Sequence, residues 1–374
     1  MIRDMWVLSI LMYMTSCFGA GSPPSPKDYT IRWNQSTLEK VSGDGDHYAG
    51  YARCRELADG SLGFAYEAGG NIFFRVRTGK GWQEPILVAA AAPEVGMAVP
   101  DFTVLGNGDV LLGYNPRPRR NAKDKHFGIR TVRSTDNGTT WQDDQLVYEA
   151  GTSFGDGCWE PVFLQLPDGD IQLYFADEGI FTHSNEQRIA MVSSTDSGTT
   201  WSKIPKTVSF RKGARDGMPV PVWLEKEERI AVAIEDNGHG PFKPYILFND
   251  GTEWDEEIAG NSSARSYAMA DSLPEKDYAG APYLAKASNG LTFLSFQWGD
   301  RLEDAQMAVA IGDEGAQNFT NVTWPFDLAK GKTGHWNSLT VLEDGRIVAL
   351  TSTNGYSETD QTEVWMIMGE MVKK

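Results

Sequence analysis

An eight-residue motif that occurs twice constrains the fold more than any other feature of this chain. Residues 134–141 read STDNGTTW and residues 194–201 read STDSGTTW, so the copies differ at one position and lie 60 residues apart. The Asp of each copy can accept hydrogen bonds from nearby backbone N–H groups, and the Gly can adopt the positive φ of a tight turn. A turn that recurs in this way predicts a repeated supersecondary unit.

Six strand–turn–strand patterns extend this repeat along the chain. The predicted units span residues 51–85, 97–141, 159–201, 217–254, 281–324 and 336–371, and in the fourth unit residues 225–228 replace the glycine turn. Apolar runs flank each turn, which is a hairpin signal, and no segment has a sustained helical period. The sequence therefore predicts an all-β fold, a six-bladed β-propeller with four-stranded antiparallel blades.

Residues 29–41 alternate in polarity but follow no hairpin partner. We predict that this segment closes the ring by joining the last blade, because an open ring would leave an unpaired strand edge. Residues 29–374 would then form one propeller domain.

The repeated octapeptide resembles the Asp-box (S-x-D-x-G-x-T-W) of the sialidase superfamily, whose members are mostly six-bladed β-propellers. The resemblance implies the same fold for this chain. Because Asp-boxes lie at the periphery of the blades, it also implies a structural role for Asp136 and Asp196.

The N-terminus is predicted to be a signal peptide at residues 1–20. Arg3 precedes an apolar run that is too short to span a bilayer and is followed by small residues. Residues 14–17 resemble a loose bacterial lipobox, in which Cys17 would be lipidated, and ordinary cleavage near Ala20 is the alternative. Residues 21–28 would form an extended tether. We therefore expect an extracytoplasmic protein (secreted, periplasmic or an outer-membrane lipoprotein) whose only membrane attachment would be a lipid on Cys17.

Charge and residue usage narrow the expected partners. The formal net charge of −17 argues against nucleic acids and anionic membranes as partners. Cys54 and Cys158 are interpreted as buried thiols, since one possible pair is not a disulfide framework. The five His residues are scattered without ligand spacing, and no phosphate-binding glycine loop precedes a helix. We expect a monomer with no metal and no cofactor.

Candidate substrate-binding residues stand at the starts of the blades. The first strand of each propeller blade lines the central channel, so residues at its mouth converge on one funnel. Polar and aromatic residues occupy these starts, although any one of them alone could be a solvated rim residue. Together they indicate a sugar site, in which aromatic faces stack on sugar rings and charged groups bind hydroxyls. The set comprises Arg53, Asp101, Trp159, Asp216, Tyr283, Trp336 and Asn337, with His239 from a nearby loop.

Glu160 and Glu235 are the best candidates for catalysis. Glycoside hydrolysis needs one carboxyl group to protonate the leaving oxygen and another to attack or to activate water. Both residues adjoin apolar strands, and desolvation beside Trp159 could raise the pKa of Glu160. Trp159-Glu160-Pro161, together with Glu235 at the end of a strand, resembles the exo-α-1,5-L-arabinanases of glycoside hydrolase family 93, six-bladed propellers described as retaining enzymes. This resemblance implies that Glu160 is the nucleophile, Glu235 the acid/base and an oligo- or polysaccharide the substrate.

Two alternatives remain open at this stage. Sialidases use three arginines, a Tyr–Glu pair and an Asp acid, and here Arg53 matches the first arginine while Asp101 could stand for the acid. Arg215 and Arg265 do not fall at matching blade starts, which weighs against a sialidase mechanism. The other alternative is a non-catalytic propeller that binds carbohydrate, because one fold supports many functions.

Overall fold

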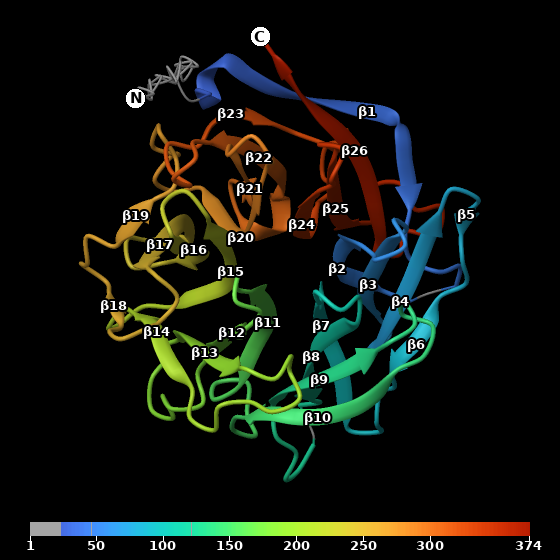
Figure 1. The fold of residues 1–374 in the computed structure, drawn as a ribbon, viewed down its shortest axis with the longest axis vertical. Coiled ribbons are helices and arrows are strands. Elements are labelled where there is room, and N and C mark those ends of the chain that lie inside the picture. The colour runs from blue at the N-terminus through green and yellow to red at the C-terminus, as the bar shows by residue number, and fades with distance from the viewer. Residues whose placement is uncertain (1–23, 46, 121) are drawn as a thin grey trace, which may run out of the picture.

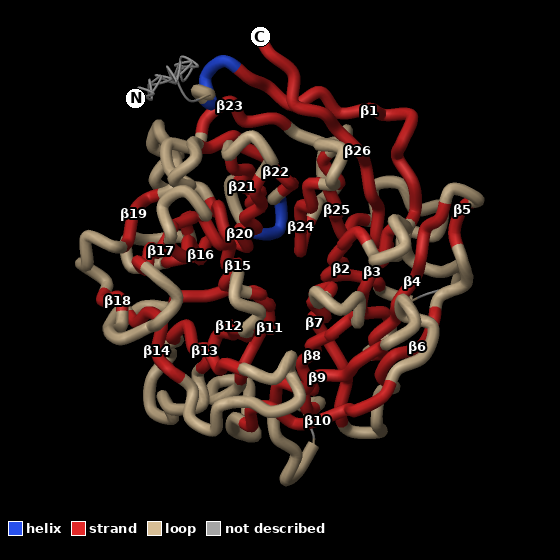
Figure 2. Tube along the Cα trace, viewed as in Figure 1, coloured by secondary structure: helices blue, strands red, loops and turns tan. Residues whose placement is uncertain are grey.

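A computed structural model describes residues 24–45, 47–120 and 122–374. Over these residues the chain forms six antiparallel sheets around a central axis (Figure 1), and its helical content is limited to the single turns η1 (Pro26–Asp28) and η2 (Leu302–Asp304) (Figure 2). The predicted all-β, six-bladed propeller is confirmed. In this part of the chain, no helix has the length and apolar character needed to cross a membrane.

Each blade runs from an inner strand at the axis to an outer strand at the periphery. Blade one contains β2 (Ala49–Glu56), β3 (Leu62–Ala68) and β4 (Asn71–Thr78), with the short β5 (Gly81–Trp82) and β6 (Ile86–Ala89) both paired with β4. Blade two contains β7 (Val95–Val104), β8 (Val110–Pro118), β9 (Gly128–Ser134) and β10 (Gln142–Glu149). Blade three contains β11 (Cys158–Gln165), β12 (Ile171–Asp177), β13 (Arg188–Ser194) and β14 (Lys206–Phe210), and β18 (Ile258–Ala259) adds a parallel edge.

Blade four contains β15 (Asp216–Leu224), β16 (Arg229–Asp236), β17 (Lys243–Asp250) and β19 (Arg265–Tyr267). Blade five contains β20 (Tyr278–Lys286), β21 (Thr292–Gly299), β22 (Gln306–Gly312) and β23 (Thr320–Thr323). Blade six contains β24 (His335–Val341), β25 (Ile347–Thr353) and β26 (Glu363–Lys373), with β1 (Tyr29–Lys40) as its outermost strand. Blade four lacks the glycine turn, as predicted, and Glu228 takes a positive φ of 48° there instead.

The ring is closed by the two ends of the chain. β1 pairs antiparallel with β26, with Tyr29 opposite Lys373 and Lys40 opposite Trp365, as predicted for an N-terminal closing strand. The segment before it differs from the expected extended tether, because Pro26–Asp28 forms the single turn η1. Asn321 holds this turn by donating to the carbonyl oxygens of Pro26 and Tyr29 at 2.7 and 2.8 Å. The predicted signal peptide and Cys17 lie outside the described residues.

The repeated octapeptide forms the self-tied turn that its sequence predicts. The Thr140 N–H donates to the Asp136 carboxylate at 2.8 Å, and Gly138 has a φ of 85°. A Cβ atom on Gly138 would lie 2.2 Å from the ring of Phe74, in the preceding blade. The second copy repeats the arrangement, with Gly198 against Leu111 of the blade before it. Each turn therefore joins neighbouring blades, and its Gly is required by packing as well as by φ.

Hydrophobic cores lie within and between the blades, where the large aliphatic and aromatic side chains are buried. Cys54 and Cys158 are free thiols buried in these cores, which confirms the prediction that they are two buried thiols. Packed sheets of this kind hold the inner strands in fixed positions around the axis.

Candidate active site

A β-bulge in the inner strand of every blade builds the mouth of the central channel. The pairing of each inner strand with its neighbour shifts register at the same place in all six blades. The residue at each bulge has a positive φ between 45 and 53°, which re-aims its side chain. The six bulge residues are Tyr51, Val99, Glu160, Met218, Ala281 and Trp336. All of them except Glu160 pack together in one apolar cluster, so the blades converge here.

Glu160 is the only charged member of this ring. Its side chain is 13% exposed, and Oε1 lies 3.7 Å from Nη2 of Arg117 on β8. Burial raises the pKa of Glu160 to about 7, while the charge of Arg117 opposes that rise. The carboxyl group therefore titrates near neutral pH.

Glu235 on β16 is held by the blade that follows it. Its Oε2 accepts a hydrogen bond of 2.7 Å from the N–H of Ala281. Gly217 and Gly280 leave room for the carboxylate, since a Cβ on either would lie within 3 Å of one of its oxygens. Burial raises the pKa of Glu235 to about 7, and the negative charge of Glu160 adds to the rise.

Glu235 accepts the N–H of Ala281, which belongs to the same ring of bulge residues as Glu160, so both carboxyl groups lie at the mouth of the channel. The negative charge of an ionised Glu160 favours the protonated form of Glu235, and that combination would supply one carboxylate and one acid.

Glu67 is a third carboxyl group at the mouth, and the sequence analysis missed it. It lies opposite Gly50 in blade one, as Glu235 lies opposite Gly217 in blade four. Glu67 accepts the N–H of Val99 at 2.7 Å, so both residues bind the bulge of the next blade. Burial raises the pKa of Glu67, and the charges of Arg117 and Arg53 lower it. Glu67 lies near the end of a second strand, as Glu235 does, and the same local pattern in the sequence could have nominated it.

Trp159 belongs to a polar network at the edge of the mouth. Its Nε1 donates to Glu178 at 2.8 Å, and Arg215 donates to the same carboxylate oxygen at 2.5 Å. The Arg117 guanidinium lies 4.8 Å from the centre of the Trp159 ring. Glu178 and Arg117 were not among the substrate-binding residues predicted from the sequence, because neither stands at a blade start.

Trp336 and Asn337 occupy the bulge of blade six. The Trp336 ring stacks on Tyr51, with the ring centroids 4.5 Å apart and the planes 11° apart. Asn337 is buried and donates to the carbonyl oxygen of Gly334 at 3.1 Å, which gives its amide a partner within the fold. Trp336 is therefore at the mouth, whereas Asn337 lies behind it.

Arg53, Asp101 and Tyr283 lie one layer beneath the bulge ring. All three follow the bulge at the equivalent strand position, and all are buried. The Arg53 guanidinium lies 5.0 Å from the Tyr283 ring across the channel. Arg55 donates to both Asp101 and Tyr283, at 3.2 and 2.9 Å. Asp101 also accepts the N–H of Phe163, and Arg53 donates to the carbonyl oxygen of Ala52, so all three side chains are bound within the fold below the mouth.

A cavity of about 800 Å³ opens at the far end of the channel from the bulge ring. Its lining includes Arg55, Phe163 on β11 and Glu225 in the turn that follows β15. It is separated from Glu160 by the layer of Arg53, Asp101 and Tyr283.

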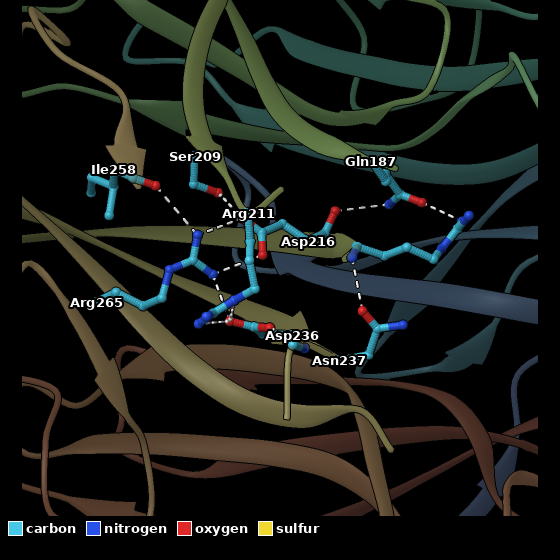
Figure 3. Close-up of polar contacts among 10 residues, drawn as sticks. Gln187, Ser209, Arg211, Asp216, Asp236, Asn237, Ile258 and Arg265 are labelled. Carbon is cyan, nitrogen blue, oxygen red and sulfur yellow. Dashed lines mark hydrogen bonds and ion pairs between the residues drawn. The ribbon is translucent and has the colours of Figure 1, made fainter. Parts of the chain in front are cut away.

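The Asp216 side chain is bound by other side chains of the fold and is not available to a substrate. Its carboxylate is fully buried and accepts from Arg265 at 2.7 and 2.6 Å (Figure 3). Arg265 and Arg211 both also donate to Asp236, so two guanidiniums and two carboxylates neutralise one another inside blade four. A sugar hydroxyl would have to displace Arg265, and we therefore assign Asp216 to the fold.

His239 lies in the exposed loop that follows β16, outside the ring of bulge residues. Within the described part of the chain, no group of three or more His, Cys, Asp or Glu side chains is placed to hold a metal ion.

Comparison with known proteins identifies the architecture. No family model matches the sequence, and no curated protein matches it either. Among solved structures, a protein of unknown function from Dyadobacter fermentans superposes with a TM-score of 0.70 at 13% identity, covering 91% of this chain and 99% of its own. The family 93 α-L-arabinofuranosidase of Fusarium graminearum, solved with arabinobiose, gives 0.65 at 19% identity, covering 92 and 98%.

The NanB sialidase of Streptococcus pneumoniae gives a TM-score of 0.63 at 12% identity, covering 90% of this chain and 70% of its own. These solved structures share the six-bladed propeller fold of this chain. The predicted resemblance to both the family 93 enzymes and the sialidases is thus confirmed at the level of this fold.

Proposed function

We propose that this propeller is an exo-acting glycoside hydrolase that removes terminal L-arabinose units from an oligo- or polysaccharide. The observation that carries the proposal is the pair Glu160 and Glu235, two carboxyl groups at one channel mouth with pKa values of about 7. A solved neighbour of the same fold is an arabinofuranosidase bound to arabinobiose, which supports the choice of sugar.

The two carboxyl groups would divide the reaction between them. In the first step a Glu160 oxygen attacks the anomeric carbon, the glycosidic C–O bond breaks, and the Glu235 proton passes to the leaving oxygen. In the second step Glu235 takes a proton from water, the water oxygen bonds to the anomeric carbon, and Glu160 leaves. Arg117, 3.7 Å from Glu160, favours its ionised form before the attack.

Substitution of each carboxyl group tests these roles. We expect Glu160→Gln to lower kcat by about a thousandfold or more on every glycoside, because it removes the nucleophile. Glu235→Gln should cause a comparable loss on arabino-oligosaccharides. Its loss should be much smaller on 4-nitrophenyl α-L-arabinofuranoside, whose leaving group needs little protonation.

Glu67→Gln distinguishes Glu235 from its counterpart in blade one. The proposal requires a larger loss for Glu235→Gln than for Glu67→Gln, with all three variants folded by circular dichroism. A normal rate for Glu160→Gln would reject the mechanism. Binding of arabino-oligosaccharides without release of reducing ends would favour the non-catalytic alternative, and turnover of a sialoside alone would favour a sialidase.

We also propose that the protein acts outside the cytoplasm, since residues 1–20 have the pattern of a signal peptide. Cell fractionation and labelling with a radioactive fatty acid, compared between wild type and Cys17→Ser, test export and lipidation. Retention of the full-length chain in the cytoplasm would contradict the proposal.

A further inference from the structure

Phe154 presents an exposed aromatic ring beside the candidate catalytic centre. The side chain is 51% exposed, although Phe is a residue that proteins usually bury. It stacks on Trp159, with centroids 5.8 Å apart and planes 30° apart, and Trp159 directly precedes Glu160 in β11. The buried ring of Phe127 contacts both, edge-on, at 5.2 and 5.0 Å. Phe154 is therefore the outer member of a three-ring cluster that reaches the mouth.

The loop that carries Phe154 is held in place by its own hydrogen bonds. The Asp156 carboxylate accepts from the N–H and the hydroxyl of Ser153 at 2.6 and 2.8 Å. The Gly151 N–H donates to the Asp156 carbonyl oxygen at 2.8 Å. The ring is thus presented by an ordered loop, which lowers the entropy cost of binding a ligand on it.

Polar groups surround the inner edge of this aromatic surface. Glu178 and Arg215 bind one another next to the Trp159 indole nitrogen, and Arg215 is one-third exposed. Arg117 contacts the same indole from the side of Glu160. An apolar ring face bordered by hydrogen-bonding groups suits the C–H face and the hydroxyl groups of a sugar, and it continues directly into the reaction centre.

We propose that the outer face of Phe154 is a second sugar-binding subsite, which holds the neutral sugar unit next to the one that reacts. The proposal rests on the proposed function for the identity of the sugar, but it depends on binding alone. The Trp159 indole, already packed by Phe154 and Arg117, would support this subsite rather than stack on the sugar itself. The subsite would make the protein prefer chains of two or more units to single glycosides.

The test compares Phe154→Ala with wild type on α-1,5-linked arabinotriose and on α-L-arabinofuranosyl fluoride, whose leaving group is a single atom and cannot reach the ring. We expect kcat/KM for arabinotriose to fall about tenfold further than kcat/KM for the fluoride, because only the trisaccharide covers the ring. Phe154→Tyr, which keeps the aromatic face, should restore the preference for the trisaccharide.

Trp324→Ala provides a matched control. Trp324 is also 51% exposed and stacks on another ring, Trp298, but it follows the outer strand β23 of blade five. This variant should leave both rates unchanged. Equal losses on the two substrates with Phe154→Ala, or no loss on either, would overturn the subsite.

A wild-type protein that hydrolyses neither substrate would reject the proposed function and leave the subsite to be decided by binding. Calorimetric titration of arabinotriose into wild type and Phe154→Ala makes that decision. Weaker binding by about tenfold in the variant supports the subsite, and equal affinity or no binding to the wild type rejects it.

Discussion

At the scale of single residues, Glu160 owes its position to the architecture of the propeller. A non-glycine residue with a positive φ is strained, by roughly 1–2 kcal/mol. All six inner strands contain such a residue, and in five blades it is apolar or aromatic. The strain is thus a property of the bulge in every blade, and what distinguishes blade three is the carboxyl group placed on it. This explains how a reactive side chain can be exchanged at this position without a change in the fold.

Arg117 sets the protonation of Glu160, and its replacement should move the pH profile. A positive charge 3.7 Å away favours the ionised carboxylate and so lowers its pKa. Since Glu160 must be ionised to attack, activity rises with pH through its pKa. In Arg117→Met that pKa rises, and the acid limb of kcat/KM should move to higher pH by about one unit.

The pH dependence of kcat/KM for wild type, Arg117→Met and Arg117→Lys measures this shift. Lys keeps the charge, so its limb should lie between the other two. Arg229→Met is the matched control, because Arg229 lies 4.4 Å from the Phe248 ring in a similar contact far from the mouth. An acid limb that does not move in Arg117→Met would contradict this role.

Residues of this site divide into those that the sequence could predict and those that it could not. Glu160 and Glu235 adjoin apolar strands in recognisable positions, so local pattern is enough to nominate them. Glu67 lies near the end of the second strand of blade one as Glu235 does in blade four, so the same local pattern could have nominated it, whereas the place of Arg117 at the mouth follows only from the pairing register. Asp101 and Asp216 look like rim charges in the sequence. The bulge, whose positive φ has no sequence signature except the Pro that follows it in four blades, places Asp101 in a buried layer below.

At the scale of elements, each blade depends on contacts with its neighbours. The order and the turns of the blades were predictable because hairpin signals are local in sequence. The joints between blades were only partly predictable. In blade five, Asp313 accepts the N–H groups of Gly315 and Gln317 in a turn that resembles the repeated octapeptide, yet Asn318 stands at the position of its Trp. The turn geometry is therefore kept in blade five although its sequence differs from that of the octapeptide.

Gly138 tests the joint between blades one and two. In Gly138→Ala the new Cβ would meet the Phe74 ring at 2.2 Å, and the positive φ would be strained as well. The matched variant Gly169→Ala has a similar φ, 96°, but nothing lies within 4 Å of its Cβ. We expect Gly138→Ala to lower the free energy of unfolding by about 1–3 kcal/mol more than Gly169→Ala does. Chemical denaturation measures the difference, and equal losses would show that φ alone accounts for the glycine.

At the scale of the whole molecule, the ring is joined by one sheet. Blade six contains strands from both ends of the chain, so β1 and β26 must meet before the last blade is complete (Figure 1). Loss of this pairing would leave β26 with an unpaired edge. Blade six would then lack its outermost strand, and no hydrogen-bonded strand pair would join the two ends of the ring. Closure therefore joins residues that are far apart in sequence, and it places a large entropy cost on this pairing.

A disulfide across this closure should stabilise the protein. Arg32 and Glu370 are paired in the register of β1 and β26, and their exposed side chains approach to 3.8 Å on the same face. Replacing both with Cys would close a loop of about 340 residues, for which the chain-entropy relation gives an upper limit of about 6 kcal/mol. We expect the oxidised double variant to unfold at a higher temperature than its reduced form, with the reduced form close to wild type. Cys54 and Cys158 are buried and should not compete for the bond. Equal unfolding temperatures for the oxidised and reduced forms would contradict this stabilisation.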